Sequence, residues 1–457
     1  MSLDSTAIAE LRSALKGRVT TPEEAEYDEL RTVFYGGIDR RPAAIVRVAE
    51  GSDVARVVGL ARETKLGLAV RGGGHSFAGH SLCDGGLVVD FRDMRALKLD
   101  AANRTAWAEA GLTSGEYTTA AGAHGLATGF GDTGSVGIGG LTLGGGIGLL
   151  VRKYGLTIDS LLAADVVAAD GRSLRADPDT NPDLFWAIRG GGGNFGVVTR
   201  FQFRMQEVPS VVGGFLILPA TPRIVASFIA EAQAAPDELS TIANVMPAPP
   251  MPFLPQEHHG RMVVFAMMVY AGESEPGEEV IAPFRKLAPP IVDMVRPMAY
   301  SEIFPPEDPN YHPKAVARTM FVDRIDQAVA EGIVARLEAS DASLRVAQLR
   351  VLGGAMARVP AEATAFAHRA SPILVNLAAF YEGPEERSVR EAWVSEFADS
   401  LRQGYHGTYV NFLGDEAPSQ VRQAYPGGTW DRLVAVKRRY DPTNLFRMNH
   451  NIPPGAP

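Results

Sequence analysis

Among its 457 residues the sequence contains one cysteine, Cys83. One thiol cannot form an intramolecular disulfide, and the nine histidines are too dispersed for a structural zinc site without cysteine ligands. The chain also lacks the run of about 18 to 20 apolar residues that a membrane-spanning helix needs, and residues 1–16 lack the apolar core of a secretory signal. We therefore expect a cytoplasmic protein with no bound metal and no membrane partner.

Clusters of positive charge are also missing. The chain has 44 Lys and Arg residues against 53 Asp and Glu residues, which gives a formal net charge of −9. Binding to a nucleic-acid phosphate backbone requires basic residues gathered on one surface. Since the basic residues here are spread along the chain, we expect no nucleic-acid partner.

Glycine, in contrast, is abundant, and its 48 residues include three dense tracts before residue 200. The tracts cover residues 70–86, 129–148 and 190–196. Glycine permits positive φ angles and close approach of backbone amides, so such tracts are typical of loops around an anion or a planar ring. Flexible linkers contain more Ser and fewer branched apolar residues. The sequence therefore predicts a ligand site in this half.

Two familiar sites do not fit the first tract. Residues 72–74 are followed neither by a helical pattern nor by an acidic residue on a second strand, which disfavours a nicotinamide-binding fold. His75 and His80 are five residues apart in a segment without helical pattern, which disfavours a metal site. The tract therefore favours a ligand other than a nicotinamide cofactor or a metal ion.

Hydrophobic periodicity predicts strands and helices on both sides of about residue 207, where glycine becomes rarer and proline more frequent. In the first region we expect a helix capped by Ser52 and ended by Gly67, and strands at 43–49, 68–71, 87–91, 105–110, 166–169, 173–175 and 197–203. In the second region we expect strands at 214–218, 262–270, 344–352 and 373–380, and helices at 224–234, 325–339 and 388–402. The pattern predicts an α+β protein with a second domain.

Four motifs then occur in a characteristic order. They are residues 70–76 (VRGGGHS), 129–148, 183–199 (DLFWAIRGGGGNFGVVT) and 440–453 (YDPTNLFRMNHNIP). Together they resemble the berberine-bridge-enzyme-like family of FAD-linked oxidases, which has the vanillyl-alcohol-oxidase or PCMH-type fold. Within this family, the segments 153–156 and 184–186 are most similar to the bacterial 6-hydroxynicotine oxidase type.

This resemblance implies a two-domain architecture. Residues 1–206 and 408–457 would form the FAD-binding domain. Residues 207–407 would form a substrate-binding domain with an antiparallel sheet backed by helices. The substrate sheet would cover the isoalloxazine ring.

The resemblance also implies the cofactor and its contacts. Backbone amides of residues 71–76 would hold the FAD pyrophosphate, and His75 would be bonded to the 8α-methyl carbon of the flavin. The alternative for His75 is an ordinary hydrogen-bonding role in the loop. The expected FAD-binding residues are Arg71, Gly72, Gly73, Gly74, His75, Ser76, Thr133, Gly134, Val136, Gly137, Gly139, Gly140, Val197, Asn449 and Asn451.

Three positions depart from the family pattern or bear on it. Many relatives have a second covalent tether from a cysteine, and Thr133 stands at that position here, so we expect attachment through His75 alone. Ile138 falls where the family is thought to control oxygen access, although simple core packing is an alternative. Phe412 replaces a tyrosine that often serves as general base, and phenylalanine has no proton to exchange.

Other residues must then assist catalysis. The candidates are Tyr409, Tyr311, Tyr381 and Arg350, and for each tyrosine the alternative is a packed core ring. Strand alternation should place Gln348 and Arg350 on one face, where an arginine beside a tyrosine would lower the pKa of the phenol. His368 matches a recurrent family segment and suits a structural role equally well.

We expect a two-electron oxidation of a small alcohol, amine or phenolic compound, with hydride transfer to flavin N5. O2 would serve as electron acceptor and would yield hydrogen peroxide. The alternatives are a dehydrogenase of the same fold that uses another acceptor, and a non-catalytic flavin-binding protein, for which Phe412 is the reason. Single attachment favours an aromatic or alicyclic substrate over a bulky oligosaccharide.

Overall fold

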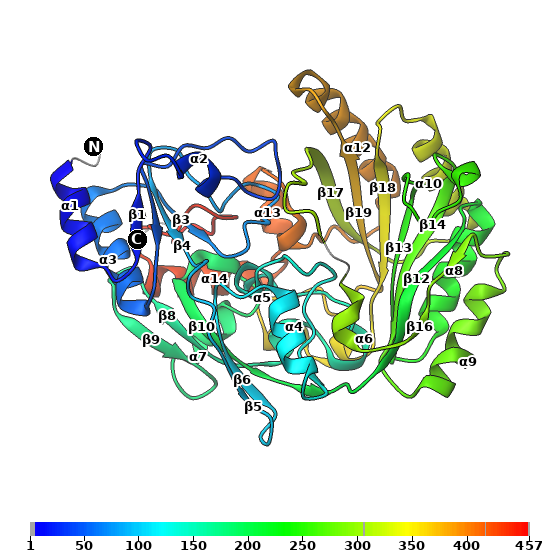
Figure 1. The fold of residues 1–457 in the computed structure, drawn as a ribbon, viewed down its shortest axis with the longest axis horizontal. Helices are drawn as coiled ribbons and strands as arrows, with labels where there is room; N and C mark the ends of the chain where they lie inside the picture. Colours follow the sequence, from blue (N-terminus) through cyan, green and yellow to red (C-terminus); the bar gives the residue numbers. More distant parts are fainter. Residues whose placement is uncertain (1–4, 305–306, 416, 456–457) are drawn as a thin grey trace.

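The computed structural model describes residues 5–304, 307–415 and 417–455. Two parts lie side by side, each with its own β-structure and its own apolar core (Figure 1). We call them the glycine-loop part, which contains the three glycine tracts, and the large-sheet part. Within the described residues, no helix has the length and apolar character needed to cross a bilayer.

Two main sheets build the glycine-loop part, and β7 (Leu126–Ala127) and β11 (Gln206–Glu207) form a further antiparallel pair. The strands of the smaller sheet are β1 (Arg18–Thr20), β2 (Ala44–Arg47), β3 (Leu68–Arg71) and β4 (Leu87–Asp90). Their order is β1-β2-β4-β3, and only β1, at the edge, is antiparallel to its neighbour. The strands of the larger sheet are β5 (Leu97–Asp100), β6 (Thr105–Glu109), β8 (Leu161–Val167), β9 (Ser173–Ala176) and β10 (Val197–Arg204). This sheet is antiparallel in the order β5-β6-β10-β8-β9.

Helix α3 (Gly51–Thr64) packs between these two sheets. Apolar residues recur on it at helical spacing and form the face that is buried. Val54, Val57 and Val58 are fully buried in the core that both sheets share. Residues of the C-terminal helix α14 (Gly428–Tyr440) enter the same core. The remaining elements before residue 208 or after residue 416 are α1 (Ser5–Ala14), α2 (Tyr27–Leu30), α4 (Ser114–Gly122), α5 (Ile138–Leu143), α6 (Val151–Tyr154), α7 (Pro182–Ala187) and α13 (Pro418–Gln423).

An antiparallel eight-stranded sheet builds the large-sheet part. Its strands are β12 (Val211–Pro219), β13 (Leu239–Pro247), β14 (Met262–Tyr270), β15 (Val292–Asp293), β16 (Arg296–Met298), β17 (Ala315–Val322), β18 (Arg345–Val351) and β19 (Ile373–Phe380). The order is β15-β12-β14-β13-β18-β19-β17, and β16 also pairs with β12.

Helices cover one face of this sheet, at the right and at the top of the large-sheet part in Figure 1. They are α8 (Pro222–Ala234), α9 (Ser274–Arg285), α10 (Gln327–Ala339) and α12 (Arg387–Leu401), and α11 (Ala355–Arg358) follows β18. Side-chain caps begin two of them: Thr221 accepts the N–H of Ile224, and Asp326 accepts the N–H of Val329. The covered face is apolar, and the other face turns toward the glycine-loop part.

The fold confirms the predicted α+β class with an antiparallel sheet backed by helices. Strands β3, β14 and β19 have the predicted bounds. Helix α3 differs, because Ser52 lies inside the helix and the chain leaves it at Lys65 with a φ of 59° instead of at Gly67. Strands β13 and β17 were not predicted, since polar residues such as Asn244 and Thr319 share a strand face with apolar ones and no regular alternation results. The predicted domain boundaries at residues 206 and 407 stay a prediction.

A buried ion pair fastens helix α14 to the loops beside it. Lys437 and Asp441 have no exposed surface, and their Nζ and Oδ2 atoms are 2.7 Å apart. Lys437 also donates to the carbonyl oxygens of Asn194 and Phe446, while Asp441 accepts the backbone N–H groups of Leu445 and Phe446. Burial lowers the pKa of Lys437, and Asp441 opposes that shift. All three donors of the Lys437 ammonium group therefore have acceptors, and both carboxylate oxygens of Asp441 have donors.

Substitution of Lys437→Met should lower the free energy of unfolding of the glycine-loop part by about 3–5 kcal/mol, because it leaves the Asp441 carboxylate buried without its cation. Urea denaturation followed by tryptophan fluorescence measures this effect. The matched control is Arg439→Met on the same helix, whose ion pair with Asp183 has an arginine side chain that is 64% exposed. Its cost should stay below about 1 kcal/mol, and equal costs would contradict the assigned role of Lys437.

Candidate functional site

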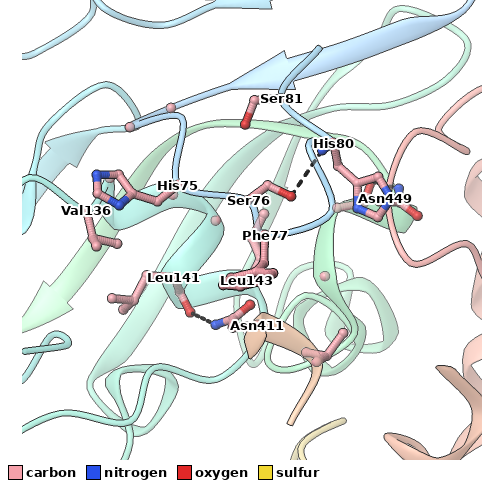
Figure 2. A pocket seen from close by; sticks show the side chains of 18 of the residues that line it. His75, Ser76, Phe77, His80, Ser81, Val136, Leu141, Leu143, Asn411 and Asn449 are labelled. Atoms are coloured by element: carbon pink, nitrogen blue, oxygen red, sulfur yellow. Dashed lines mark hydrogen bonds between the residues drawn. The ribbon is translucent and has the colours of Figure 1, made fainter. Parts of the chain in front are cut away.

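A cavity of about 450 Å³ lies between the two parts. All three glycine tracts line it, together with strands β18 and β19 of the large sheet and two C-terminal segments, 409–413 and 446–450. Figure 2 shows how side chains of separate elements, among them His75, Leu141, Asn411 and Asn449, surround it. The expected cofactor residues that line it are Gly72, Gly73, Gly74, His75, Ser76, Thr133, Val136, Gly137, Gly139, Gly140, Val197 and Asn449.

The first two glycine loops cross in close contact at this cavity. A Cβ atom on Gly73 would lie 2.3 Å from the backbone nitrogen of Gly137, and a Cβ on Gly137 would lie 2.2 Å from the nitrogen of Gly73. Real Cβ contacts are much longer, so neither position accepts a side chain without moving the other loop. The crossing brings the backbone of residues 72–74 and 136–140 to one wall of the cavity.

Three of the expected cofactor residues do not line the cavity. The Arg71 guanidinium is buried under the first loop, where it donates to the carbonyl oxygens of Leu30 and Thr32. Burial lowers the pKa of Arg71 to about 10. Gly134 and Asn451 also lie outside the lining. Arg71 therefore supports the loop from behind.

Asn449 presents an unsatisfied acceptor to the cavity. Its amide nitrogen donates to the carbonyl oxygens of Gly193 and Phe446 at 3.2 and 3.1 Å. Its Oδ1 atom is buried and has no hydrogen-bond partner among the described residues. Because a buried acceptor without a partner is costly, this atom is suited to receive an N–H or O–H group of a bound molecule.

His75 lies at the side of the cavity formed by the second glycine loop. Its Nε2 atom forms a 2.9 Å hydrogen bond with the Ser135 hydroxyl, and Phe34 stacks on the ring at a centroid distance of 4.3 Å. Burial lowers the pKa of His75 to about 4. The imidazole is therefore neutral near pH 7, with one nitrogen lone pair available.

The large sheet supplies a polar wall opposite the glycine loops. Gln348 and Arg350 lie on one face of β18, as strand alternation predicts, and Asn376 stands beside Gln348 on β19. The Nε2 group of Gln348 donates to Asn244, and Gln348 Oε1 accepts from Arg350. The Asn376 Oδ1 atom is buried without a partner among the described residues. Uncharged amides thus dominate this wall.

Arg350 forms an ion pair that joins the two parts. Its guanidinium lies 2.6 Å from Asp132, which precedes Thr133 in the second glycine loop, and 5.0 Å from the centre of the Phe412 ring. The positive charge that enters the cavity is therefore balanced by a carboxylate. Asp132 was not among the predicted site residues, because a single aspartate in a glycine tract gives no signal before its partner on a distant strand is known.

The three candidate tyrosines have different surroundings. Tyr409 lines the cavity, and its hydroxyl oxygen accepts N–H groups from Gly146, Ile147 and Asn411 at 3.0, 3.3 and 2.9 Å. Burial raises the pKa of Tyr409 and outweighs the opposite effects of these donors and of Arg350. Tyr381 is buried in a small apolar cluster away from the cavity, and Tyr311 is 52% exposed. The structure brings only Tyr409 to the site.

Three further residues of interest lie outside the cavity lining. Ile138 is buried in the core of the glycine-loop part, between Gly137 and Gly139 of the lining, and its role in packing or oxygen access stays a prediction. Cys83 is buried near the carbonyl of Leu87, and burial raises its thiol pKa to about 11. His368 hydrogen-bonds to Tyr405 and to the carbonyl oxygen of Ala424, which is a structural arrangement.

Comparisons with known proteins agree with this geometry. Residues 42–177 match the family model of an FAD binding domain, and residues 408–453 match the model described as berberine and berberine like. The chain is 30% identical to an uncharacterized FAD-linked oxidoreductase, YgaK, of Bacillus subtilis, over 97% of this chain and 98% of that protein. It is 29% identical to (R)-6-hydroxynicotine oxidase of Paenarthrobacter nicotinovorans, over 96% of this chain and 97% of that protein.

Solved structures show the same fold. The crystal structure of 6-hydroxy-D-nicotine oxidase from Arthrobacter nicotinovorans matches with a TM-score of 0.85 and 27% identity, over 96% of this chain and 98% of that chain. The family resemblance and the PCMH-type fold expected from the four motifs are thereby confirmed. With its glycine loops, its C-terminal segment and its matched relatives, this chain belongs to the berberine-bridge-enzyme-like family of FAD-linked oxidoreductases.

Proposed function

We propose that this FAD-linked oxidoreductase oxidises a small uncharged alcohol, amine or phenolic compound, with O2 as the electron acceptor and hydrogen peroxide as the product. The observation that carries the proposal is one cavity with two unlike walls, glycine-loop backbone on one side and the amides of Gln348 and Asn376 on the other. The flavin, when bound, supplies the hydride acceptor. The large-sheet wall would hold the substrate carbon against it.

Features of the cavity fit FAD. The crossing of Gly73 and Gly137 leaves no room for side chains where backbone amides would meet the cofactor. Asn449 Oδ1 offers an acceptor that the described residues leave unsatisfied. We assign these segments to cofactor binding, with Arg71 as their support. The contacts are residues 72–76, Thr133, Val136, Gly137, Gly139, Gly140, Val197 and Asn449.

The positions of the possible nucleophiles support single covalent attachment through His75. His75 lines the cavity and is neutral. Thr133 lines it where many relatives have a cysteine, and a threonine hydroxyl is a poor nucleophile in comparison with a thiolate. Cys83, the one thiol of the chain, is buried outside the lining. His75 is therefore the residue that we expect to carry the flavin.

The substrate wall favours a neutral molecule with hydrogen-bonding groups. Asn376 Oδ1 would accept a donor of the substrate, and the amide of Gln348 is already oriented by Asn244. The charge of Arg350 is balanced by Asp132, so the wall offers no net charge to an ionic substrate. The ring of Phe412 provides an apolar surface beside these polar groups.

Asp132 is our candidate to accept the proton of a substrate hydroxyl. Phe412 cannot do so, and the two lone pairs of a neutral Tyr409 phenol are already used by its three N–H donors. Asp132 lines the cavity, and Arg350 orients its carboxylate. We therefore assign proton removal to Asp132 and positioning roles to Arg350 and Tyr409.

The first test concerns the covalent bond. After acid precipitation and washing, the wild-type protein should stay yellow, and the tryptic peptide of residues 72–92 should carry the mass of the flavin at His75. The His75→Ala variant should release its flavin, while His80→Ala, a change in the same peptide, should retain it. Colour lost from the wild-type pellet, or a flavin found at Cys83, would overturn this assignment.

The second test concerns the crossing of the loops. Gly73→Ala should lose most bound FAD, since the new Cβ would displace the Gly137 loop. The matched control is Gly59→Ala, where a Cβ atom meets no other atom within 4 Å in helix α3. That change should leave flavin content intact and raise stability by about 0.5–1 kcal/mol. Flavin absorbance per protein and thermal denaturation measure both effects.

The third test concerns turnover. In a panel of alcohols, amines and phenols, peroxide release should identify a substrate, and reoxidation of the reduced flavin in air should be complete within seconds. For an alcohol substrate, Asp132→Asn should reduce kcat about 10²- to 10⁴-fold. The control Asp165→Asn removes another aspartate paired with an arginine, Arg200, neither of which lines the cavity, and should leave kcat unchanged. Reoxidation over many minutes would indicate a dehydrogenase instead.

A further inference from the structure

Ser135 connects His75 to an acidic residue of the large-sheet part. The Ser135 hydroxyl lies 2.9 Å from His75 Nε2 and also forms a short hydrogen bond to Glu307 Oε2. The backbone N–H of Ser135 donates to the other oxygen of the same carboxylate at 3.0 Å. Glu307 is therefore bound to Ser135 through both of its oxygens, although it comes from the segment before β17.

This arrangement determines which nitrogen of His75 carries the proton. A carboxylate can only accept hydrogen bonds, so the Ser135 hydroxyl donates its hydrogen to Glu307. The hydroxyl oxygen then accepts the N–H of His75 at Nε2. Because burial keeps the ring neutral, the lone pair is on Nδ1. The stacked ring of Phe34 restricts rotation that would exchange the two nitrogens.

We propose that Ser135 and Glu307 form a proton relay that prepares His75 for covalent attachment to the flavin through Nδ1. The inference rests on the proposed covalent bond and adds the residues that promote it. Both are positioning residues, because they act through His75. Neither was singled out by the sequence motifs, since Glu307 is 172 residues away from Ser135 along the chain.

Covalent attachment would form one N–C bond and release two protons and two electrons. The Nδ1 lone pair forms a bond to the 8α carbon, which loses one C–H proton. The imidazole, now substituted at Nδ1, loses its Nε2 proton through the Ser135 hydroxyl to Glu307. Two electrons remain on the flavin ring, and O2 removes them together with two protons as hydrogen peroxide.

The relay also links attachment to the assembly of the two parts. His75 and Ser135 belong to the glycine loops, whereas Glu307 reaches them from the large-sheet part. Attachment should consequently become fast only when the two parts are docked. FAD that binds to the glycine loops alone would remain exchangeable.

The experiment uses full-length protein produced under riboflavin starvation and then supplied with FAD. Covalent attachment is followed as acid-precipitable flavin fluorescence, and non-covalent binding as total flavin retained on native gel filtration. Ser135→Ala and Glu307→Gln should slow attachment about tenfold or more and leave native flavin binding unchanged. Glu302→Gln, a nearby exposed glutamate paired with Arg296, should attach flavin at the wild-type rate.

Chemical rescue distinguishes proton transfer from a merely structural contact. Added acetate should accelerate attachment in Glu307→Ala but not in the wild type, and Ser135→Thr should restore the rate because it keeps the hydroxyl. Wild-type rates in both Ser135→Ala and Glu307→Gln, or no response of Glu307→Ala to acetate, would overturn the relay. Absence of covalent flavin in the wild type would instead contradict the proposed attachment at His75.

Discussion

The close crossing of two backbone segments at Gly73 and Gly137 is the constraint on which the site depends. Each glycine occupies the space that a Cβ atom of the other would need, so the two loops fix one another. The buried guanidinium of Arg71 holds the first loop from behind, through the carbonyl groups of Leu30 and Thr32. A wall of backbone therefore faces the cavity, and a cofactor can be bound by main-chain groups without competing side chains.

The opposite wall is built in the reverse way, because side chains and not backbone groups face the cavity there. Gln348, Arg350 and Asn376 project from neighbouring strands whose other face is fixed by an apolar core. Arg350 reaches across the cavity to Asp132, so that charge is balanced where the two parts meet. Glu307 makes a second polar contact across the same boundary, at Ser135. These contacts tie the large-sheet wall to the glycine loops.

Much of this organisation could be predicted from the sequence. The glycine tracts, the four ordered motifs and the strand that presents Gln348 and Arg350 are local patterns. They led to the fold class, the family and FAD as the cofactor, while the role of His75 stays a prediction. Strands β13 and β17 escaped prediction, because polar and apolar residues are mixed on both faces of each strand, so that no regular alternation identifies them. Tyr311 and Tyr381 matched the required residue type, but the structure places neither in the cavity lining.

The sequence by itself determined the glycine loops that line the cavity and the loss of the family tyrosine at Phe412, since residue type and local spacing are sufficient for both. Only the tertiary structure decided the partners of these residues. Asp132 meets Arg350 across 218 positions of the chain, and Ser135 meets Glu307 across 172. Such pairings depend on how two separately folded sheets face one another, and no local pattern in a single sequence encodes that arrangement.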